Sequence, residues 1–206
     1  MTDAVLGWTG PDAGVPWHYG EPLREQRRLV QRVAAVDLSH RPVLAVSGDD
    51  RLTWLHAITS QQFLRLEPGV PTSAYILDPQ GHIEHAFEGV DDGTTFWAHT
   101  EPGHLEALLG WLRRMQFAAR VVVSDRSGDR AVVGHADGAR IVLRERLDAE
   151  LGDVRAGTWA YEALRIASGR PRPFVDTDDR TIPNEVGVPD GDRLGDAVHL
   201  AKGCYR

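Results

Sequence analysis

Residues 72–98 read TSAYILDPQGHIEHAFEGVDDGTTFWA, and the turn residues and apolar runs of this stretch indicate a set of paired strands. Apolar and aromatic residues recur on both sides of Pro79-Gln80-Gly81, which is typical of a turn. Asp91-Asp92-Gly93 is a second hairpin signal further along the same stretch. The pattern therefore predicts three consecutive antiparallel strands, at 72–78, 82–90 and 94–98.

Helical and strand patterns flank these three strands on both sides. Leu23, either Leu29 or Val30, and Val33 recur near helical spacing behind a proline suited to a first turn. The segment Ser47-Gly48-Asp49-Asp50 precedes another helical pattern, and we expect its side-chain oxygens to cap that helix. The sequence predicts helices at 22–35, 52–58 and 101–115, and strands at 43–46 and 119–123.

The order of these elements predicts the α+β class, with an antiparallel-rich sheet and helices packed on one of its faces. A weaker hairpin pattern follows around Asp137-Gly138, and then a helix at 158–168 with Gly169 as its C-terminal cap. Residues 170–195 are rich in Pro, Asp and Gly and read mostly as loop. The domain prediction is an N-terminal arm at 1–20, a first α+β lobe at 21–124 and a shortened second lobe at 125–206.

Composition excludes several classes of protein. The chain has 206 residues, of which 42% are hydrophobic, enough for one large domain or two small ones. It has no apolar stretch of about 18 residues, and its start does not resemble a signal peptide, so we expect no membrane span. A single cysteine cannot form an internal disulfide, which suits a cytoplasmic location. A net charge of -7 argues against broad nucleic-acid binding.

Three motifs near the C-terminus carry a family resemblance. Residues 161–171, YEALRIASGRP, form a helix followed by Gly-x-Pro, and Thr181-Ile182-Pro183-Asn184-Glu185 contains a Pro-x-Glu element. The chain then ends in Lys202-Gly203-Cys204-Tyr205-Arg206. In this order and spacing the motifs resemble the YgfZ-type folate-binding proteins, relatives of the glycine-cleavage aminomethyltransferase. Asp78-Pro79-Gln80-Gly81 is similar to the Asp-x-x-Gly hairpin of the same family.

The sequence also departs from the family pattern. Aminomethyltransferases place an acidic Asp-Asp pair just after this hairpin, where the present chain has His82-Ile83-Glu84-His85. Residues 124–157 are shorter than the middle domain of the family, which supplies a glutamate that holds the pterin. The family signature continues beyond Lys-Gly-Cys-Tyr into a C-terminal β-barrel. The first departure favours the YgfZ-like branch, and the third predicts that the barrel is absent.

The resemblance implies an aminomethyltransferase-like fold that binds tetrahydrofolate or a derivative and acts in assembly or maintenance of Fe–S enzymes, with Fe–S client proteins as partners. It implies that Cys204 and Lys202 carry the chemistry, since a neighbouring positive charge favours the thiolate. Gly203 allows close approach to the ligand, and Tyr205 stacks on it. The alternatives are a cysteine that packs as a small buried hydrophobe, a solvated lysine and a packed tyrosine. One thiol cannot hold a four-thiolate cluster.

Arg165 and Glu185 complete the predicted folate site. The fork of Arg165 suits a folate carboxylate or a polar group of the pterin, and its alternative is an ion pair with Glu162 three residues earlier. Glu185 either faces the cavity or accepts backbone N–H bonds and anchors its own loop. Both residues are predicted to bind the cofactor.

Two other functions remain open at this level. The first is a folate-dependent aminomethyl transferase, in which Glu84 replaces the missing aspartate. The second is a non-enzymatic interaction domain with the fold but no complete pocket. On a strand His82 and Glu84 share one face while His85 points to the other, so no metal site is predicted. Whether the chain is an enzyme, and its oligomeric state, are left open by the sequence.

Overall fold

The computed structural model describes residues 4–186, which divide into two compact units. Unit 1 comprises residues 4–43 and Ser127–Arg170, and unit 2 comprises Leu44–Arg126 and residues 171–186. Each unit is therefore built from two stretches that are separated in the sequence. The consecutive lobes at 21–124 and 125–206, and the arm at 1–20, remain predictions.

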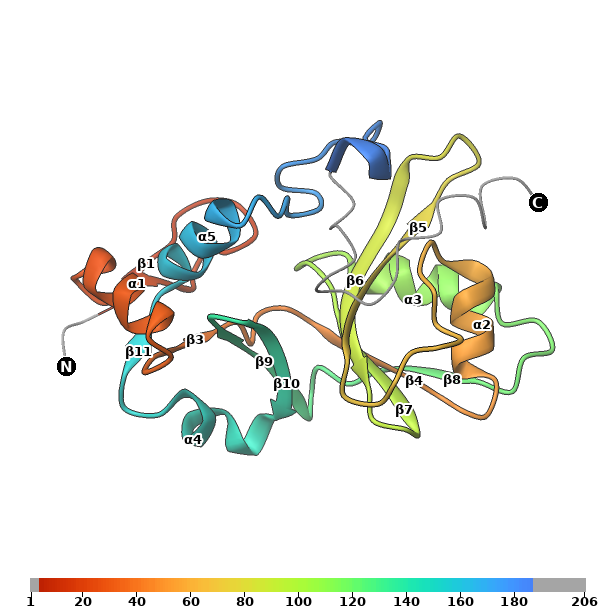
Figure 1. Ribbon diagram of the computed structural model, residues 1–206, viewed down its shortest axis with the longest axis horizontal. Coiled ribbons are helices and arrows are strands. Elements are labelled where there is room, and N and C mark those ends of the chain that lie inside the picture. The colour runs from red at the N-terminus through yellow and green to blue at the C-terminus, as the bar shows by residue number, and fades with distance from the viewer. Residues whose placement is uncertain (1–3, 187–206) are drawn as a thin grey trace. The chain divides into compact units, whose positions relative to one another are not determined.

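Unit 2 is organised around a five-stranded sheet with the strand order β5-β6-β7-β4-β8. The pairs β5–β6, β6–β7 and β4–β8 are antiparallel. The three strands predicted from residues 72–98 are confirmed, and they lie side by side as successive hairpins (Figure 1). The strands are β4 (Val43–Ser47), β5 (Pro71–Leu77), β6 (Ile83–Asp91), β7 (Thr95–His99) and β8 (Val122–Asp125).

Helices α2 (Arg51–Ile58) and α3 (Leu105–Arg114) cover one face of this sheet. Leu55 of α2 and Leu108 of α3 are fully buried against the inward side chains of the strands. The Phe63 ring packs edge-on to Phe96, with 5.2 Å between ring centroids. Burial of these aliphatic and aromatic side chains is the main source of the stability of unit 2.

On the opposite face of the same sheet, the segment 171–186 packs on β5 and β6. Because side chains alternate along a strand, Tyr75 and Leu77 point away from the two helices and instead join a second apolar cluster. Phe174 and Val186 of the covering segment belong to that cluster. The N–H of Ile83 also donates to the carbonyl oxygen of Thr181 at 2.9 Å. The segment ends in a 3-10 turn at Pro183–Val186.

Unit 1 contains a four-stranded sheet with the order β10-β9-β3-β11. Its strands are β3 (Ala35–Asp37), β9 (Arg130–His135), β10 (Gly138–Leu143) and β11 (Arg155–Ala156). Only the short β11–β3 pair is parallel, whereas β3–β9 and β9–β10 are antiparallel. Together with unit 2 this gives the mixed α+β, antiparallel-rich architecture that the sequence predicts.

Helices pack on both faces of the unit 1 sheet, whereas the sequence predicts helices on one face only. Val36 and Val132 pack toward α1 (Pro22–Val30) and α5 (Thr158–Ala167). Their strand neighbours Ala35 and Val133 point the other way and pack on Leu151 of α4 (Leu147–Leu151). The prediction missed α4 because a helix of five residues offers too few turns for a periodic signal.

Residues 4–20 contain a small two-stranded sheet made of β1 (Val5–Leu6) and β2 (Pro16–His18). The buried carboxylate of Glu25 in α1 ties this hairpin to unit 1. Its Oε1 accepts the N–H groups of Tyr19 and Glu21, at 2.8 and 3.2 Å. Its Oε2 accepts the N–H of Gly157, at the start of α5, at 2.9 Å. One side chain therefore joins three segments of the unit.

Two helix ends differ from the sequence prediction. Helix α1 ends at Val30 rather than residue 35, and Arg32 follows in a left-handed conformation with φ 61°. Asp50 occupies the N-cap position of α2 without a side-chain capping bond, because its carboxylate instead binds the backbone N–H and guanidinium of Arg120. Gly169, with φ 66°, takes the left-handed conformation expected after α5. Within residues 4–186 no helix has the length and apolarity needed to cross a bilayer.

Candidate functional site

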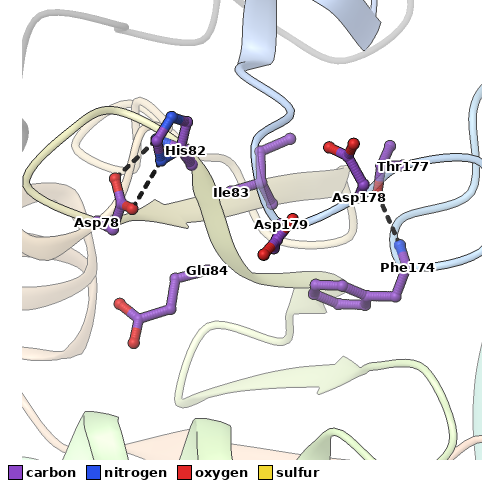
Figure 2. Close-up of a pocket in the computed structure, with 8 residues that line it drawn as sticks. All are labelled: Asp78, His82, Ile83, Glu84, Phe174, Thr177, Asp178 and Asp179. Atoms are coloured by element: carbon purple, nitrogen blue, oxygen red, sulfur yellow. Dashed lines mark hydrogen bonds and ion pairs between the residues drawn. The ribbon is translucent and has the colours of Figure 1, made fainter.

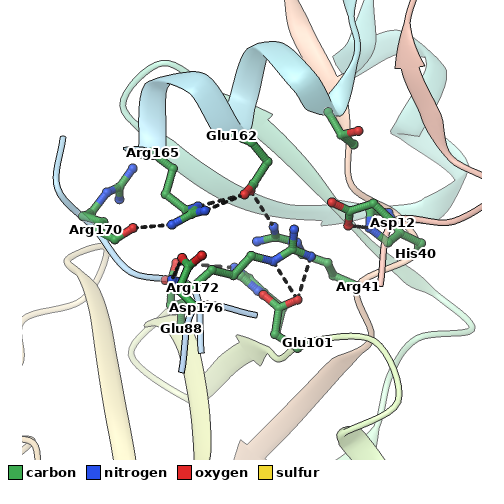
Figure 3. A network of polar contacts seen from close by, with 12 residues as sticks. Asp12, His40, Arg41, Glu88, Glu101, Glu162, Arg165, Arg170, Arg172 and Asp176 are labelled. Carbon is green, nitrogen blue, oxygen red and sulfur yellow. Dashed lines mark hydrogen bonds and ion pairs between the residues drawn. The ribbon is translucent and has the colours of Figure 1, made fainter. Parts of the chain in front are cut away.

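Arg165 lies on α5 of unit 1 with its guanidinium held on two sides (Figure 3). Its Nε and Nη2 contact Glu162 Oε2 at 2.9 and 2.8 Å, one turn earlier in the helix. Its Nη1 donates to the carbonyl oxygen of Arg170 at 2.6 Å. The side chains of both Arg165 and Glu162 are almost buried, with 11% and 13% exposed. The ion pair offered as the alternative role of Arg165 is thus present, and a folate contact remains a prediction.

Arg41 and His40 extend the polar cluster around Arg165 within unit 1. Arg41 Nη2 lies 3.8 Å from Glu162 Oε1, and its guanidinium carbon sits 5.7 Å from the centre of the Tyr161 ring. Beside it, His40 Nε2 lies 2.8 Å from Asp12 Oδ1. Two arginines around one glutamate make a site that is rich in positive hydrogen-bond donors, and such sites suit carboxylates.

Glu185 belongs to the segment 171–186 of unit 2. Its Oε2 accepts the N–H of Ile182 at 3.0 Å, and the residue is exposed. The sequence predicts this loop-anchoring contact as one of two roles for Glu185, and the other role, cofactor binding, stays a prediction. The predicted residues Lys202, Gly203, Cys204 and Tyr205 lie outside the described residues.

A shallow hollow of about 440 Å³ opens in unit 2 beside the hairpin of β5 and β6 (Figure 2). The turn between these strands and the covering segment 171–186 form its walls. Within residues 4–186 no group of three or more His, Cys, Asp or Glu side chains could hold a metal ion. The lining residues are Asp78, His82, Ile83, Glu84, Phe174, Thr177, Asp178 and Asp179.

Two aspartates of this hollow form hydrogen bonds within its walls. Asp78 accepts the N–H of His82 at 2.8 Å and contacts His82 Nδ1 at 2.9 Å. Burial acts to raise the pKa of Asp78, but its hydrogen bonds from His82 and Gln80 outweigh this and lower it. The backbone N–H of Arg180 and the hydroxyl of Thr181 lower the pKa of Asp178. Both aspartates are therefore ionised at neutral pH.

His85 is buried beneath α3 on the helix-covered side of the unit 2 sheet. It is 7% exposed, and its ring lies edge-on to Trp111 with 6.3 Å between centroids. Burial lowers the pKa of His85 to about 4, and the positive charges of His104 and Arg114 add to the shift. The imidazole is therefore neutral at pH 7.

Burial of neutral His85 makes stability depend on pH. The unfolded state takes up a proton near pH 6.5 while the folded state does so only near pH 4, so stability is lost as pH falls between these values. The expected loss from this group is about 2–3 kcal/mol. Urea unfolding from pH 7 to pH 4 measures it. In His85→Gln this part of the pH dependence of the unfolding free energy should vanish. His18 lies on the half-buried β2, and His18→Gln should keep the dependence.

The structure of this chain is similar to that of a known protein. No protein-family model matches the chain. Among solved structures it is similar to the crystal structure of glycine cleavage system aminomethyltransferase T from Bartonella henselae, with a TM-score of 0.55. The fold is aminomethyltransferase-like. The similarity extends over 84% of this chain at 18% identity, which shows the fold alone.

The same comparison limits what can be transferred. The chain spans 42% of the length of the Bartonella protein. The aminomethyltransferase-like α+β fold expected from the motifs is confirmed, while the missing C-terminal barrel stays a prediction. The YgfZ-type assignment is finer than a shared fold and also stays a prediction.

Several residues of the polar cluster and the hollow were not found from the sequence. Arg41 is one arginine among 22 other basic residues, and nothing in its neighbours marks it as buried. Phe174 lies in a Pro- and Asp-rich loop, yet its ring stacks on His104 with 3.9 Å between centroids. Contacts between residues so distant along the chain leave no local pattern in one sequence.

Proposed function

We propose that the chain binds tetrahydrofolate or a derivative of it. The observation that carries the proposal is the aminomethyltransferase-like fold over 84% of the chain. The ordered motifs at residues 161–171, 181–185 and 202–206 support it, because they resemble those of folate-binding relatives. The finer proposal is a YgfZ-type protein that serves assembly or maintenance of Fe–S enzymes, with Fe–S proteins as clients.

Arg165 is the residue proposed to meet the negative end of the ligand. Glu162 holds its guanidinium from one side and the Arg170 carbonyl from another, so the fork is fixed in direction before any ligand arrives. A fixed donor group loses little conformational entropy on binding, which favours affinity. Glu185 and Gly203 are proposed to shape the cofactor site, and Tyr205 to stack on the ligand.

Cys204 and Lys202 are proposed to carry any chemistry that accompanies folate binding. A thiolate is the reactive form of cysteine, and a lysine two residues away favours it. Replacement of Cys204 by serine keeps the size of the side chain and removes the thiolate. It should leave folate affinity unchanged and abolish the chemistry, if the two functions are separate.

An aminomethyl (one-carbon) transferase is the second candidate, and the position of Glu84 favours it. Glu84 lines the hollow, and its carboxylate makes no hydrogen bond or ion pair with other residues in the range 4–186. A carboxylate in this state can accept a proton during transfer. Tetrahydrofolate-dependent formation of methylene-tetrahydrofolate that is lost in Glu84→Gln would support this candidate.

The test of folate binding is anaerobic calorimetric titration of the 206-residue chain with tetrahydrofolate. We expect saturable one-to-one binding that Arg165→Ala weakens about tenfold or more, since a hydrogen bond to a charged group is lost. The affinity of Arg165→Lys should fall between those of the wild type and Arg165→Ala, because lysine keeps the charge but lacks the forked guanidinium. Arg146→Ala removes an exposed arginine of unit 1 and serves as the matched control.

Two outcomes would contradict the proposal. Absence of binding at millimolar tetrahydrofolate would leave the non-enzymatic interaction domain as the better description. Equal weakening by Arg165→Ala and Arg146→Ala would show that general charge, rather than the position of Arg165, governs the affinity. Thermal unfolding of each variant establishes that the comparison is made between folded proteins.

A further inference from the structure

Strand β10 is an edge of the unit 1 sheet, and no strand pairs with its outer side within the described part of the chain. Just past the strand, the N–H of Arg144 donates to the carbonyl oxygen of Asp129 at 3.0 Å, so the even-numbered residues of β10 face β9. Because backbone groups point to alternate sides along a strand, the N–H groups of Ala139, Ile141 and Leu143 point outward. The carbonyls of Ala139 and Ile141 do the same. This edge therefore offers both donors and acceptors to an extended chain.

Strand β5 is an edge of the unit 2 sheet, but the chain covers its outer side. The carbonyl oxygen of Tyr75 accepts the N–H of Ser60 at 2.9 Å, and the Tyr75 N–H donates to Ser60 Oγ at 3.1 Å. Gln61 Nε2 donates to the carbonyl oxygen of Ser73 at 2.9 Å. In residues 4–186, β10 has no cover of this kind. The two edges therefore differ, and the edge at β10 is open to a partner.

The side chains of β10 do little to prevent association. Edge strands are commonly protected by a proline, a bulge or several charges. β10 reads Gly-Ala-Arg-Ile-Val-Leu, its register with β9 is regular, and its only charge is that of Arg140. Ile141 and Val142 pack on opposite faces of the sheet, yet both remain half-buried, and Leu143 is 37% exposed. The open edge therefore carries apolar side chains beside its outward-pointing backbone groups.

A second copy of β10 satisfies these groups in one register. We infer that the chain forms a two-fold dimer in which β10 pairs antiparallel with β10 of a second copy, so that the two unit 1 sheets become one. With Ile141 opposite Ile141 of the second copy, Ala139 lies opposite Leu143. Outward-pointing N–H groups then meet outward-pointing carbonyls, and a small side chain lies opposite a large one. A shift of one residue would instead set these groups against groups that already bind β9.

The charges at the two ends of β10 also favour an antiparallel pair of identical strands. Asp137 directly precedes the strand and is exposed, whereas the turn that follows the strand carries Arg144 and Arg146 beside Glu145. Antiparallel pairing brings the acidic end of each copy to the more basic end of the other. Parallel pairing would bring like ends together. Hydrogen bonding, side-chain size and charge are thus all self-complementary, as a two-fold interface requires.

The oligomeric state of the full chain tests the dimer. Sedimentation equilibrium from about 1 μM to about 1 mM should show the mass rise from 22.8 kDa toward twice that value. Ile141→Pro removes an outward-pointing N–H and Leu143→Lys adds a charge at the edge, and both variants should stay monomeric. Val154→Lys is the matched control, because Val154 has the same 37% exposure in unit 1 and lies next to β11. It should dimerise like the wild type.

Cysteine cross-linking tests the register, in a chain that also carries Cys204→Ser. Directly opposite residues of this kind have Cα atoms about 5.5 Å apart, within reach of a disulfide. Ile141→Cys should therefore give a covalent dimer with oxidised glutathione. Leu143→Cys should not, because its counterpart in the second copy lies about four residues away along the strands, or roughly 13 Å.

Several results would overturn the inference. One is a mass of 22.8 kDa at every concentration. Another is a dimer that survives both Ile141→Pro and Leu143→Lys, and a third is equal cross-linking of Ile141→Cys and Leu143→Cys. Slow hydrogen exchange of the Ile141 amide in a monomer would show that the chain itself covers the edge. None of these results bears on folate binding, which the titrations of Arg165→Ala test separately.

Discussion

Replacement of Gly48 by alanine is expected to lower the free energy of unfolding by about 3–5 kcal/mol. Gly48 lies in the turn before α2 with φ 115°, a conformation that an alanine adopts only under strain. An added Cβ would also overlap the carbonyl oxygen of Arg120. That oxygen cannot easily retreat, because the carboxylate of Asp50 holds the Arg120 backbone N–H at 2.9 Å.

Chemical denaturation followed by tryptophan fluorescence measures this loss, and a second glycine separates its two causes. Gly69 has φ 83°, but an added Cβ there meets nothing within 4 Å. Gly69→Ala should therefore cost only about 1 kcal/mol, from backbone strain alone. Equal losses at the two positions would show that the contact with Arg120 contributes nothing.

Removal of the charge of Glu101 is expected to destabilise unit 2 by about 3–5 kcal/mol. Both Arg172 Nε and Nη2 donate to Glu101 Oε2, at 2.9 and 2.7 Å (Figure 3). The two side chains are 4% and 11% exposed, so Glu101→Gln removes a negative charge that lies directly against a buried guanidinium. Arg172 lies in the segment 171–186, so this segment should loosen first, and hydrogen exchange of the Ile83 amide would report it.

A double replacement tests whether the loss of stability comes from losing the ion pair or from leaving one of its charges buried. Glu101→Leu with Arg172→Met removes both charges and should recover much of the stability lost in Glu101→Gln, because both members of the buried pair are then apolar. The exposed pair of Arg24 with Glu21 is the control, since its side chains are 60% and 62% exposed. Glu21→Gln should change stability by less than about 1 kcal/mol. A double variant as unstable as the single one would contradict the argument.

The elements with strong local signals could be predicted from the sequence. The three strands of residues 72–98 and the helix α5 follow from alternation, turn residues and helical spacing, and all are present. These features depend on residues that are neighbours along the chain. The short helix α4 could not be predicted, because five residues give too few turns for a periodic signal and its Leu151 packs on the distant Ala35 and Val133. The hairpin of β1 and β2 could not be predicted either, because part of its support is distant in the sequence: the hydroxyl of Thr158 donates to the carbonyl oxygen of Pro16.

The side-chain partnerships of the candidate site were only partly predictable. The sequence predicts the pair of Arg165 with Glu162 as one alternative, because both lie on one helix at a spacing of three residues. Asp50 was expected to cap α2, but it binds Arg120, which is 70 residues away in the sequence. A carboxylate has several acceptable donors, and only the folded chain decides among them.

The division of each unit into two stretches has a consequence for how the protein is made. Strand β3 of unit 1 leaves the ribosome early, but it pairs with β9 and β11, whose residues lie at 130–156. All of residues 44–126 must be synthesised in between. The unit 1 sheet of the nascent chain is therefore incomplete through much of translation. Val36 cannot pack on Val132 and Ala156 until those residues have been synthesised.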